Sequence, residues 1–138
     1  MDMRLYFLAL LSLICFKTSF AQGINKEVLP NDTTIYSKYI VDQPAYLSSQ
    51  ELNKHAQENI KYPANAFLKG IEGTVYVQFV VEKDGSITNV KVSKGVDEEL
   101  DKEAVRVISI MPRWQPGKIN GVVVRTKNET PVKFKKLN

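Results

Sequence analysis

Hydrophobic and polar residues alternate strictly along residues 74 to 82, and this period of two predicts a half-buried β-strand. One side of the strand holds Val75, Val77, Phe79 and Val81, and the other holds Thr74, Tyr76, Gln78 and Glu82. Val80 is the one residue that breaks the alternation. We therefore expect one face of this strand to pack against a core and the other to meet solvent.

The dipeptide Asp84-Gly85 follows this strand and predicts a tight hairpin. A two-residue type I′ turn at these positions would set Lys83 opposite Ser86. In that register the second strand, residues 87 to 94, continues the apolar side without a slip. The facing pairs would be Phe79 with Val90 and Val77 with Val92.

A helix is predicted after the hairpin. It begins near Asp97, whose carboxylate can cap the first free amides, and it ends before Pro112. Its apolar residues recur at helical spacing and are Leu100, Ala104, Val107, Ile108 and Met111. Because they form a single stripe, we expect this helix to cover one face of the sheet.

A last alternating stretch predicts a third, long strand with a solvated outer face. Its apolar side holds Val122, Val124, Thr126, Thr130, Val132 and Phe134, and its polar side holds Arg125, Lys127, Glu129, Lys133 and Lys135. Upstream, Ser48 and Glu51 form a capping box that opens a short helix toward Ile60. The pattern predicts an α+β fold of two layers, in which a three-stranded antiparallel sheet (β-β-α-β) packs against one helix and a short helix precedes it.

The first 21 residues have the pattern of an export signal. Arg4 precedes an apolar run over residues 5 to 16, and Ser19-Phe20-Ala21 suits a signal peptidase that cuts before Gln22. We expect residues 22 to 47 to be a polar linker or a weak extra strand, and residues 48 to 138 to form the domain. The alternative is an uncleaved anchor in the inner membrane, although the apolar run is shorter than the about 20 residues that a span requires.

Composition argues against catalysis and against nucleic-acid binding. The formal net charge of +4 is small and scattered along the chain, so no nucleic-acid partner is expected. His55 is the only histidine and has no cysteine or cluster of carboxylates near it in the sequence. Cys15, the only cysteine, lies in the leader, so the exported chain would have no disulfide. We predict no enzyme, no catalytic residues, no cofactor and no metal.

Two sequence segments indicate a family. The segment Tyr62-Pro63-Ala64-Asn65-Ala66-Phe67-Leu68-Lys69-Gly70-Ile71-Glu72-Gly73-Thr74 and the later Trp114-Gln115-Pro116-Gly117 resemble the C-terminal domain of TonB, an energy transducer, in the form found in Bacteroidetes. The resemblance covers about Asn59 to Phe134. It implies a periplasmic domain that captures the extended N-terminal peptide of TonB-dependent outer-membrane transporters by β-strand addition, in support of energy-coupled transport.

The same resemblance implies where the peptide binds. The Tyr-Pro segment lies beside the peptide in this family, so Lys61, Tyr62 and Pro63 are candidate contacts. The peptide pairs with the exposed edge of the last strand, which corresponds here to Val122, Val123, Val124, Arg125, Thr126 and Lys127. Pro131 lacks an amide and should interrupt the available edge. Trp114 is expected to fill the core.

Two other functions remain open at this point. If the leader is an anchor, the chain would be a short membrane-bound TonB transducer that faces the periplasm and works with a proton-driven inner-membrane motor complex. If the edge strand pairs with its own copy, the chain would be a structural module that forms a homodimer. The sequence does not identify the transporter or its solute.

Overall fold

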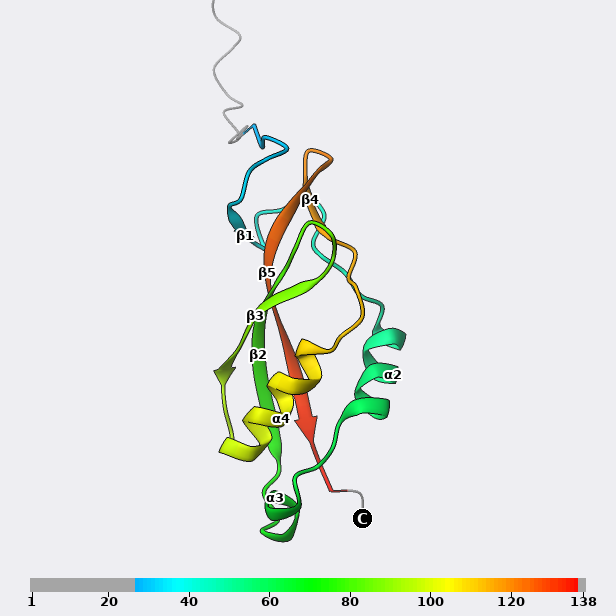
Figure 1. Cartoon of the computed structure of the whole chain (residues 1–138), viewed down its shortest axis with the longest axis vertical. Helices are drawn as coiled ribbons and strands as arrows, with labels where there is room; N and C mark the ends of the chain where they lie inside the picture. The colour runs from blue at the N-terminus through cyan, green and yellow to red at the C-terminus, as the bar shows by residue number, and fades with distance from the viewer. Residues whose placement is uncertain (1–26, 137–138) are drawn as a thin grey trace, which may run out of the picture.

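The computed structural model describes residues 27 to 136 and contains a strongly curled sheet with three helices (Figure 1). The signal or anchor predicted for residues 1 to 21 lies outside the described residues. In chain order the elements are β1 (Ile35–Ser37), α2 (Ser49–Asn59), α3 (Ala64–Leu68), β2 (Gly73–Val81), β3 (Ile87–Lys94), α4 (Glu98–Ser109), β4 (Gly117–Ile119) and β5 (Val122–Phe134).

The sheet has more strands than the sequence pattern predicted. Its order is β1-β5-β2-β3, with β4 also paired to β5. The three predicted strands, β2, β3 and β5, are present and antiparallel, but β1 runs parallel to β5, so the sheet is mixed. The predicted count of three is therefore wrong. Strands of three residues such as β1 and β4 are too short to show an alternation, and their pairing depends on the long strand beside them.

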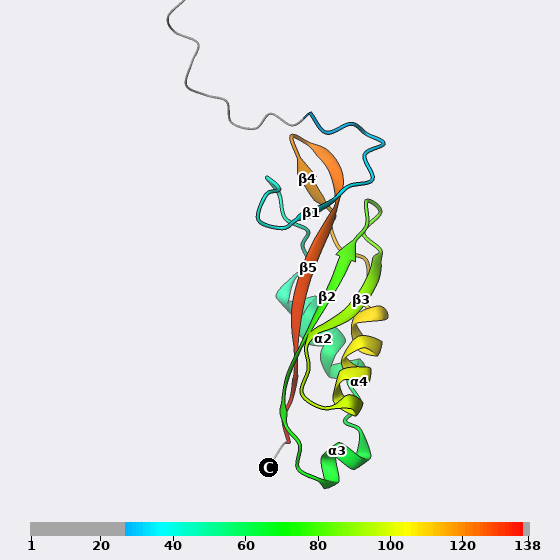
Figure 2. The same ribbon diagram turned by 90° about the vertical axis from the view of Figure 1, so that its left-hand side faces the viewer.

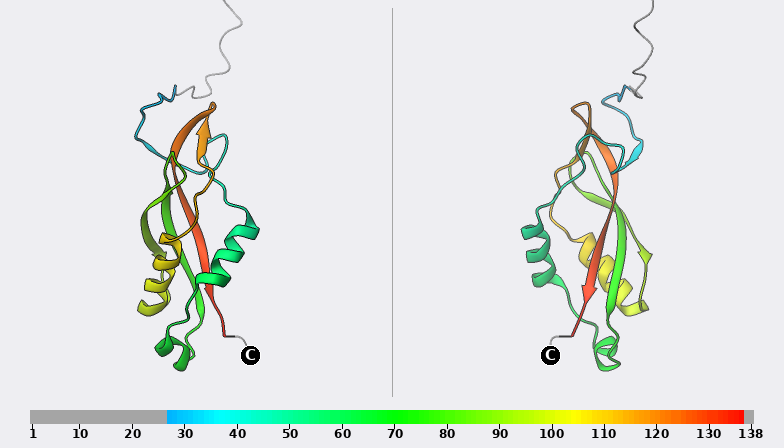
Figure 3. Two further views of the ribbon diagram at one scale, coloured as in Figure 1. Left: turned by 45° about the vertical axis from the view of Figure 1, so that its right-hand side comes forward. Right: turned by 180° about the vertical axis from the view of Figure 1, so that it is seen from behind.

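The helices lie on one side of the sheet (Figure 2), and the back view shows the strands of the opposite face nearest the viewer (Figure 3). Helix α4 begins after Asp97, whose carboxylate accepts hydrogen bonds from two amides of the first turn, as predicted. Helix α2 begins at the predicted capping box of Ser48 and Glu51. A hydrogen bond of 2.9 Å between His55 Nε2 and the Val107 carbonyl oxygen joins the two helices, so His55 has a structural partner.

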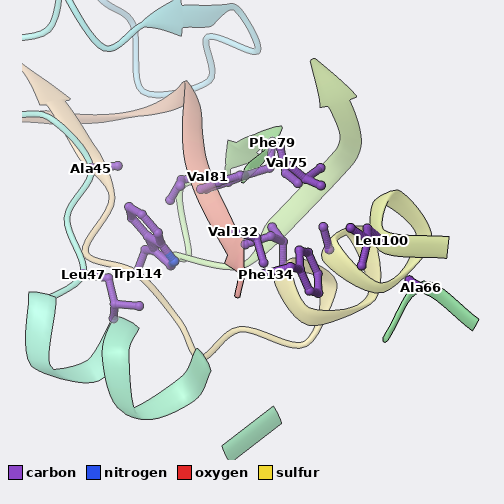
Figure 4. Close-up of a cluster of buried hydrophobic side chains, with 13 residues drawn as sticks. Ala45, Leu47, Ala66, Val75, Phe79, Val81, Leu100, Trp114, Val132 and Phe134 are labelled. Carbon is purple, nitrogen blue, oxygen red and sulfur yellow. The ribbon is translucent and has the colours of Figure 1, made fainter. Parts of the chain in front are cut away.

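The main core lies between the sheet and the helices (Figure 4). Phe79 from β2 is 1% exposed, and its ring meets the Trp114 ring edge-on at 5.2 Å between centroids. Leu100 and Ile108 of α4 are fully buried, and Val90 packs against the same cluster. The apolar faces predicted for β2, β3, α4 and the C-terminal part of β5 therefore meet in one core, and Trp114 fills it as expected.

A second, smaller cluster lies at the end of the molecule opposite α3 (Figure 1). Its buried members are Val28, Tyr36 and Val124, and Val41, Ile119 and Val122 pack against them. Tyr36 comes from β1 and is 4% exposed. Residues before the predicted domain boundary at 48 thus contribute a strand and a buried aromatic ring to the fold.

The hairpin between β2 and β3 differs from the predicted turn. Glu82 and Ser86 face each other, since the Glu82 amide donates to the Ser86 carbonyl oxygen at 2.8 Å. The loop therefore has three residues, and only Gly85 has a positive φ, of 84°. Such a loop uses a type I turn followed by a left-handed glycine, so Asp84 can keep an ordinary backbone conformation.

The predicted register of the hairpin is only partly correct. Val77 faces Val92 as predicted, but the pairing shifts between Gln78 and Val80. Asn89 lies at this shift with φ of 51°, a left-handed conformation that asparagine tolerates better than most residues. The shift means that β3 has an extra residue there, which is a β-bulge. Periodicity alone does not reveal a bulge.

Two glycines with similar backbone angles give a test of the hairpin geometry. Gly85 (φ 84°) and Gly121 (φ 78°) both occupy the left-handed region, but a Cβ on Gly85 would lie 2.1 Å from the Trp114 carbonyl oxygen, whereas one on Gly121 would meet open space. We expect Gly121→Ala to lower the free energy of unfolding by about 1 kcal/mol and Gly85→Ala by about 2–3 kcal/mol. Urea unfolding of both variants measures the difference. Equal losses would contradict the observed contact between the hairpin and Trp114.

Candidate functional site

Of the strands longer than three residues, β3 and β5 could offer a free edge to a peptide, and β3 is poorly suited to it. β3 is the last strand in the sheet order, so no described strand pairs with its outer edge. Its pairing with β2 shifts twice, near Ser93 and near Asn89, and it carries Lys91 and Lys94. Bulges and lysines are common devices that prevent edge-to-edge pairing. The structure therefore favours β5 over β3 as a template for strand addition.

The β4–β5 hairpin shows which backbone groups of β5 point toward β4 and which point to the opposite edge. Asn120 and Gly121 form its two-residue loop, with φ of 49° and 78°, as in a type I′ turn. In such a hairpin the residues flanking the loop exchange both backbone hydrogen bonds, so Val122 bonds to β4. Because directions alternate along a strand, Val124 also points toward β4 and Val123 points the other way.

Pro131 extends this assignment to the rest of β5. It faces Tyr76 in a continuous antiparallel register between β2 and β5. Since proline has no amide to donate, it fits a ladder position whose backbone groups point away from the partner strand. Alternation then directs the amides of Lys127, Glu129 and Lys133 away from β2. The odd-numbered residues from 123 to 133 thus share one outer edge of β5.

The outer edge is partly occupied, and this corrects the expectation of a free edge along Val122–Lys127. β1 pairs with Arg125, Thr126 and Lys127 in parallel, so these three residues already have a strand beside them. Among the described residues, no strand pairs with the outer edge from Asn128 to Phe134. A strand of 13 residues is long enough for β1 and a second segment to lie along it in succession.

The side chain of Arg125 binds within its own chain. Its Nε and Nη2 atoms donate to the two carboxylate oxygens of Glu82 at 2.6 and 2.9 Å, and Nη1 donates to the Thr33 carbonyl oxygen at 2.9 Å. This ion pair is not among the features predicted from the sequence. It could have been found from the β2–β5 register, because Val81 faces Thr126 and the next residues along are Glu82 and Arg125.

The hydrogen bonds from Arg125 hold the pKa of Glu82 below its ordinary value of 4.5. A carboxyl whose pKa is lower in the folded state stabilises the fold at pH values above its unfolded pKa, and the stabilisation is lost as pH falls through the folded pKa. We expect Glu82→Gln to cost about 1–2 kcal/mol at pH 7. The cost should shrink from pH 4.5 downward, as urea unfolding at several pH values can show. A cost that does not change with pH would contradict the ion pair.

The Tyr-Pro segment lies at the other end of β5. The Tyr62 ring packs edge-on against Phe134 and Phe67, with centroids 5.8 and 5.6 Å apart, and its hydroxyl donates to the Ile71 carbonyl oxygen. Removal from water raises the pKa of Tyr62, with a further contribution from the Glu72 carboxylate. Tyr62 is therefore a protonated hydrogen-bond donor, and its ring packs against the core beside the C-terminal end of β5.

The neighbours of Tyr62 are also placed by the fold. The Lys61 amide donates to Glu103 Oε1 at 2.7 Å, and Lys61 itself is exposed. Pro63 is the N-cap residue of α3. The structure thus separates the predicted site residues into two groups, one at each end of β5. From Lys127 to Phe134 is seven steps, or about 24 Å of strand, so one peptide reaches both groups only if it runs along the unpaired edge between them.

The described residues contain neither a candidate metal site nor a candidate membrane-spanning helix. Within residues 27 to 136, no group of three or more His, Cys, Asp and Glu side chains could hold a metal ion. None of the helices in that range is long and apolar enough to cross a membrane.

Comparison with known proteins identifies the family. Residues 58–136 match the family described as Gram-negative bacterial TonB protein C-terminal, so the chain belongs to this family. Protein TonB of Vibrio cholerae serotype O1 is 31% identical over 107 residues, which cover 77% of this chain and 43% of that protein. The chain thus corresponds to less than half the length of this relative. The family is not enzymatic, and its C-terminal domain is periplasmic.

The fold agrees with this assignment. The solution structure of the Helicobacter pylori TonB C-terminal domain, residues 179–285 of that protein, superimposes with a TM-score of 0.50 at 25% identity. The match covers 67% of this chain and 86% of the H. pylori chain. The resemblance predicted from the Tyr-Pro and Trp-Gln-Pro-Gly segments is therefore confirmed.

Proposed function

We propose that this chain is a periplasmic module that captures the N-terminal extended peptide of TonB-dependent outer-membrane transporters and so supports energy-coupled transport. The peptide adds as a strand to the outer edge of β5. The observation that supports this proposal most directly is the edge itself, since within residues 27 to 136 no strand lies beside the outward backbone groups of Glu129, Pro131 and Lys133. An unpaired row of this kind is a template for another extended chain.

The regular shape of β5 favours the same reading. Its register with β2 is continuous over nine pairs, from Gly73–Phe134 to Val81–Thr126, so the strand is free of bulges along its unpaired stretch. The predicted contacts at Val122–Lys127 and at Lys61–Pro63 would then be the two ends of the peptide path. Backbone pairing at a net ~1 kcal/mol per hydrogen bond, reduced by ordering costs, gives micromolar-scale affinity, which permits repeated release.

A titration tests the proposal. Isotope-labelled protein is titrated with synthetic peptides that copy the N-termini of outer-membrane transporters from the same genome, and amide shifts are followed by NMR. We expect the largest shifts along residues 122 to 134, with little change in β3. If no such peptide perturbs these amides at millimolar concentration, the capture role is wrong, and pairing between two copies through β5 becomes the better account.

We also propose that cleavage after Ala21 releases the module into the periplasm. The leader lies outside the described residues, so support comes from its sequence pattern alone. The intact mass of the protein from whole cells decides the matter. A mass that retains Met1, found with inner membranes, would favour the anchored transducer that works with a proton-driven motor complex.

A further inference from the structure

The strand β1 occupies part of the edge that the proposed peptide needs. Ile35, Tyr36 and Ser37 face Arg125, Thr126 and Lys127 in parallel. Tyr36 points to the buried side of the sheet, where it is 4% exposed and packs with Val28 and Val124. Its neighbours in β1, Ile35 and Ser37, are exposed. β1 therefore binds to β5 as a short peptide with one apolar anchor would.

The segment from residue 28 to residue 41 pairs with β5 over only three residues, and the backbone bonds of Asp42 and Gln43 to the Lys118 carbonyl oxygen hold the chain that follows it. Beyond the three paired residues, Arg125 Nη1 donates to the Thr33 carbonyl oxygen and Lys83 Nζ to the Pro30 carbonyl oxygen, each at 2.9 Å. The apolar cluster around Tyr36 is separate from the main core. Segments with short pairing and a small cluster of their own open at much lower cost than the whole fold. The segment can thus leave β5 while the core stays folded.

We propose that β1 is an internal substitute for the partner peptide and that the incoming peptide replaces it. This inference rests on the function proposed above. The peptide would run parallel to β5 and place a large apolar or aromatic side chain over Thr126, in the niche that Tyr36 fills. The adjacent positions, which correspond to Ile35 and Ser37, face solvent and accept small or polar side chains.

A peptide longer than β1 can displace it, because the peptide pairs with more residues of β5. β1 pairs with three residues of β5, whereas a peptide that replaces it can continue along Asn128–Phe134, which no described strand covers. β1 competes effectively nonetheless, because it belongs to the same chain and is always close. The apparent dissociation constant of the peptide is then the intrinsic one divided by the fraction of molecules in which β1 is open. Anything that fixes β1 in place should weaken peptide binding.

A reversible disulfide tests this directly. Ser37 and Lys127 are facing partners on neighbouring strands, so their Cα atoms should be about 4.8 Å apart, which a disulfide can bridge. Both residues are exposed. The variant Ser37→Cys/Lys127→Cys is made with Cys15→Ser, which removes the native cysteine. We expect transporter peptides to bind the oxidised form at least tenfold more weakly than the reduced form of the same protein. The two single-cysteine variants, which cannot close the bridge, should show no such redox dependence.

A second measurement tests the niche without any transporter. The probe is a peptide that copies residues 31 to 39 of this chain. Replacing Tyr36 by Ala in the full chain should loosen β1 and vacate the niche, so the variant should bind the probe at least tenfold more tightly than the wild type does. A probe with Ala in place of its tyrosine should lose this gain. Tyr39→Ala is the matched control, because Tyr39 lies in the same segment but is 84% exposed.

The outcomes separate the two proposals. If transporter peptides bind the oxidised and reduced forms equally, β1 is not a competitor and this inference is wrong, while peptide capture stands. If the probe binds the Tyr36→Ala variant at residues 122 to 127 but no transporter peptide binds any form, the niche exists and the proposed partner is wrong. If neither kind of peptide binds any form, both proposals fail.

Discussion

Replacing Phe79 by Ala should lower the free energy of unfolding by about 3–5 kcal/mol, enough to unfold most of a domain of this size. Phe79 is the largest of the fully buried side chains and contributes an edge-on contact with Trp114. Its removal leaves a cavity between the sheet and the helices, and the lost ring contact lowers the stability further. Urea unfolding followed by circular dichroism gives the value.

Tyr76 is the matched control for this change. It lies on the same strand, β2, but on the opposite face, where it is half-buried and its ring lies 5.9 Å from Lys94 Nζ. Tyr76→Ala should cost about 1 kcal/mol, because it leaves no enclosed cavity. Equal losses at the two positions would show that the assigned faces of β2 are wrong.

Replacing Glu129 by Pro should abolish the binding of transporter peptides while leaving the domain folded. The alternation along β5 directs the Glu129 amide to the outer edge, so proline removes a donor that a peptide needs and takes none from the ladder with β2. The proline ring also obstructs the approach of another strand. We expect the affinity to fall by at least a factor of ten, measured by calorimetric titration.

Two controls accompany this variant. Glu129→Ala keeps the amide but loses the hydrogen bond of 2.6 Å from the Ser93 hydroxyl, so it should bind peptide almost as well as the wild type. Thr130→Pro lies one residue further, where alternation directs the amide to β2, and it should destabilise the fold instead. Unchanged binding by a folded Glu129→Pro variant would rule out strand addition along Asn128–Phe134.

The long elements of this fold could be predicted from sequence because each has several periods of its own pattern. β2, β5 and α4 were predicted with their buried faces correct, since residues such as Val75, Leu100 and Val132 recur at strand or helix spacing. The hairpin turn was not, because Asp84-Gly85 suits a two-residue loop and a three-residue loop almost equally. The contact between Gly85 and Trp114, which accompanies the longer loop, joins residues distant in sequence.

The candidate site was only partly predictable for a related reason. The resemblance to TonB indicated β5 as the binding strand, but the pairing of its edge with β1 depends on the burial of Tyr36 against Val124. Nothing in the polar segment before residue 48 distinguishes that tyrosine from an exposed one such as Tyr39. The outward direction of the β5 amides likewise follows from the register with β2, and no local pattern encodes it.

Amide hydrogen exchange can show whether a peptide strand adds to the outer edge of β5. The protein is compared with and without a saturating transporter peptide. We expect new protection at the outward amides of Glu129 and Lys133, while the exchange rate of the Thr130 amide, which alternation directs to β2, changes little. Strand addition to β5 would be contradicted by protection confined to β3. It would also be contradicted if the outward β5 amides exchanged equally fast with and without the peptide.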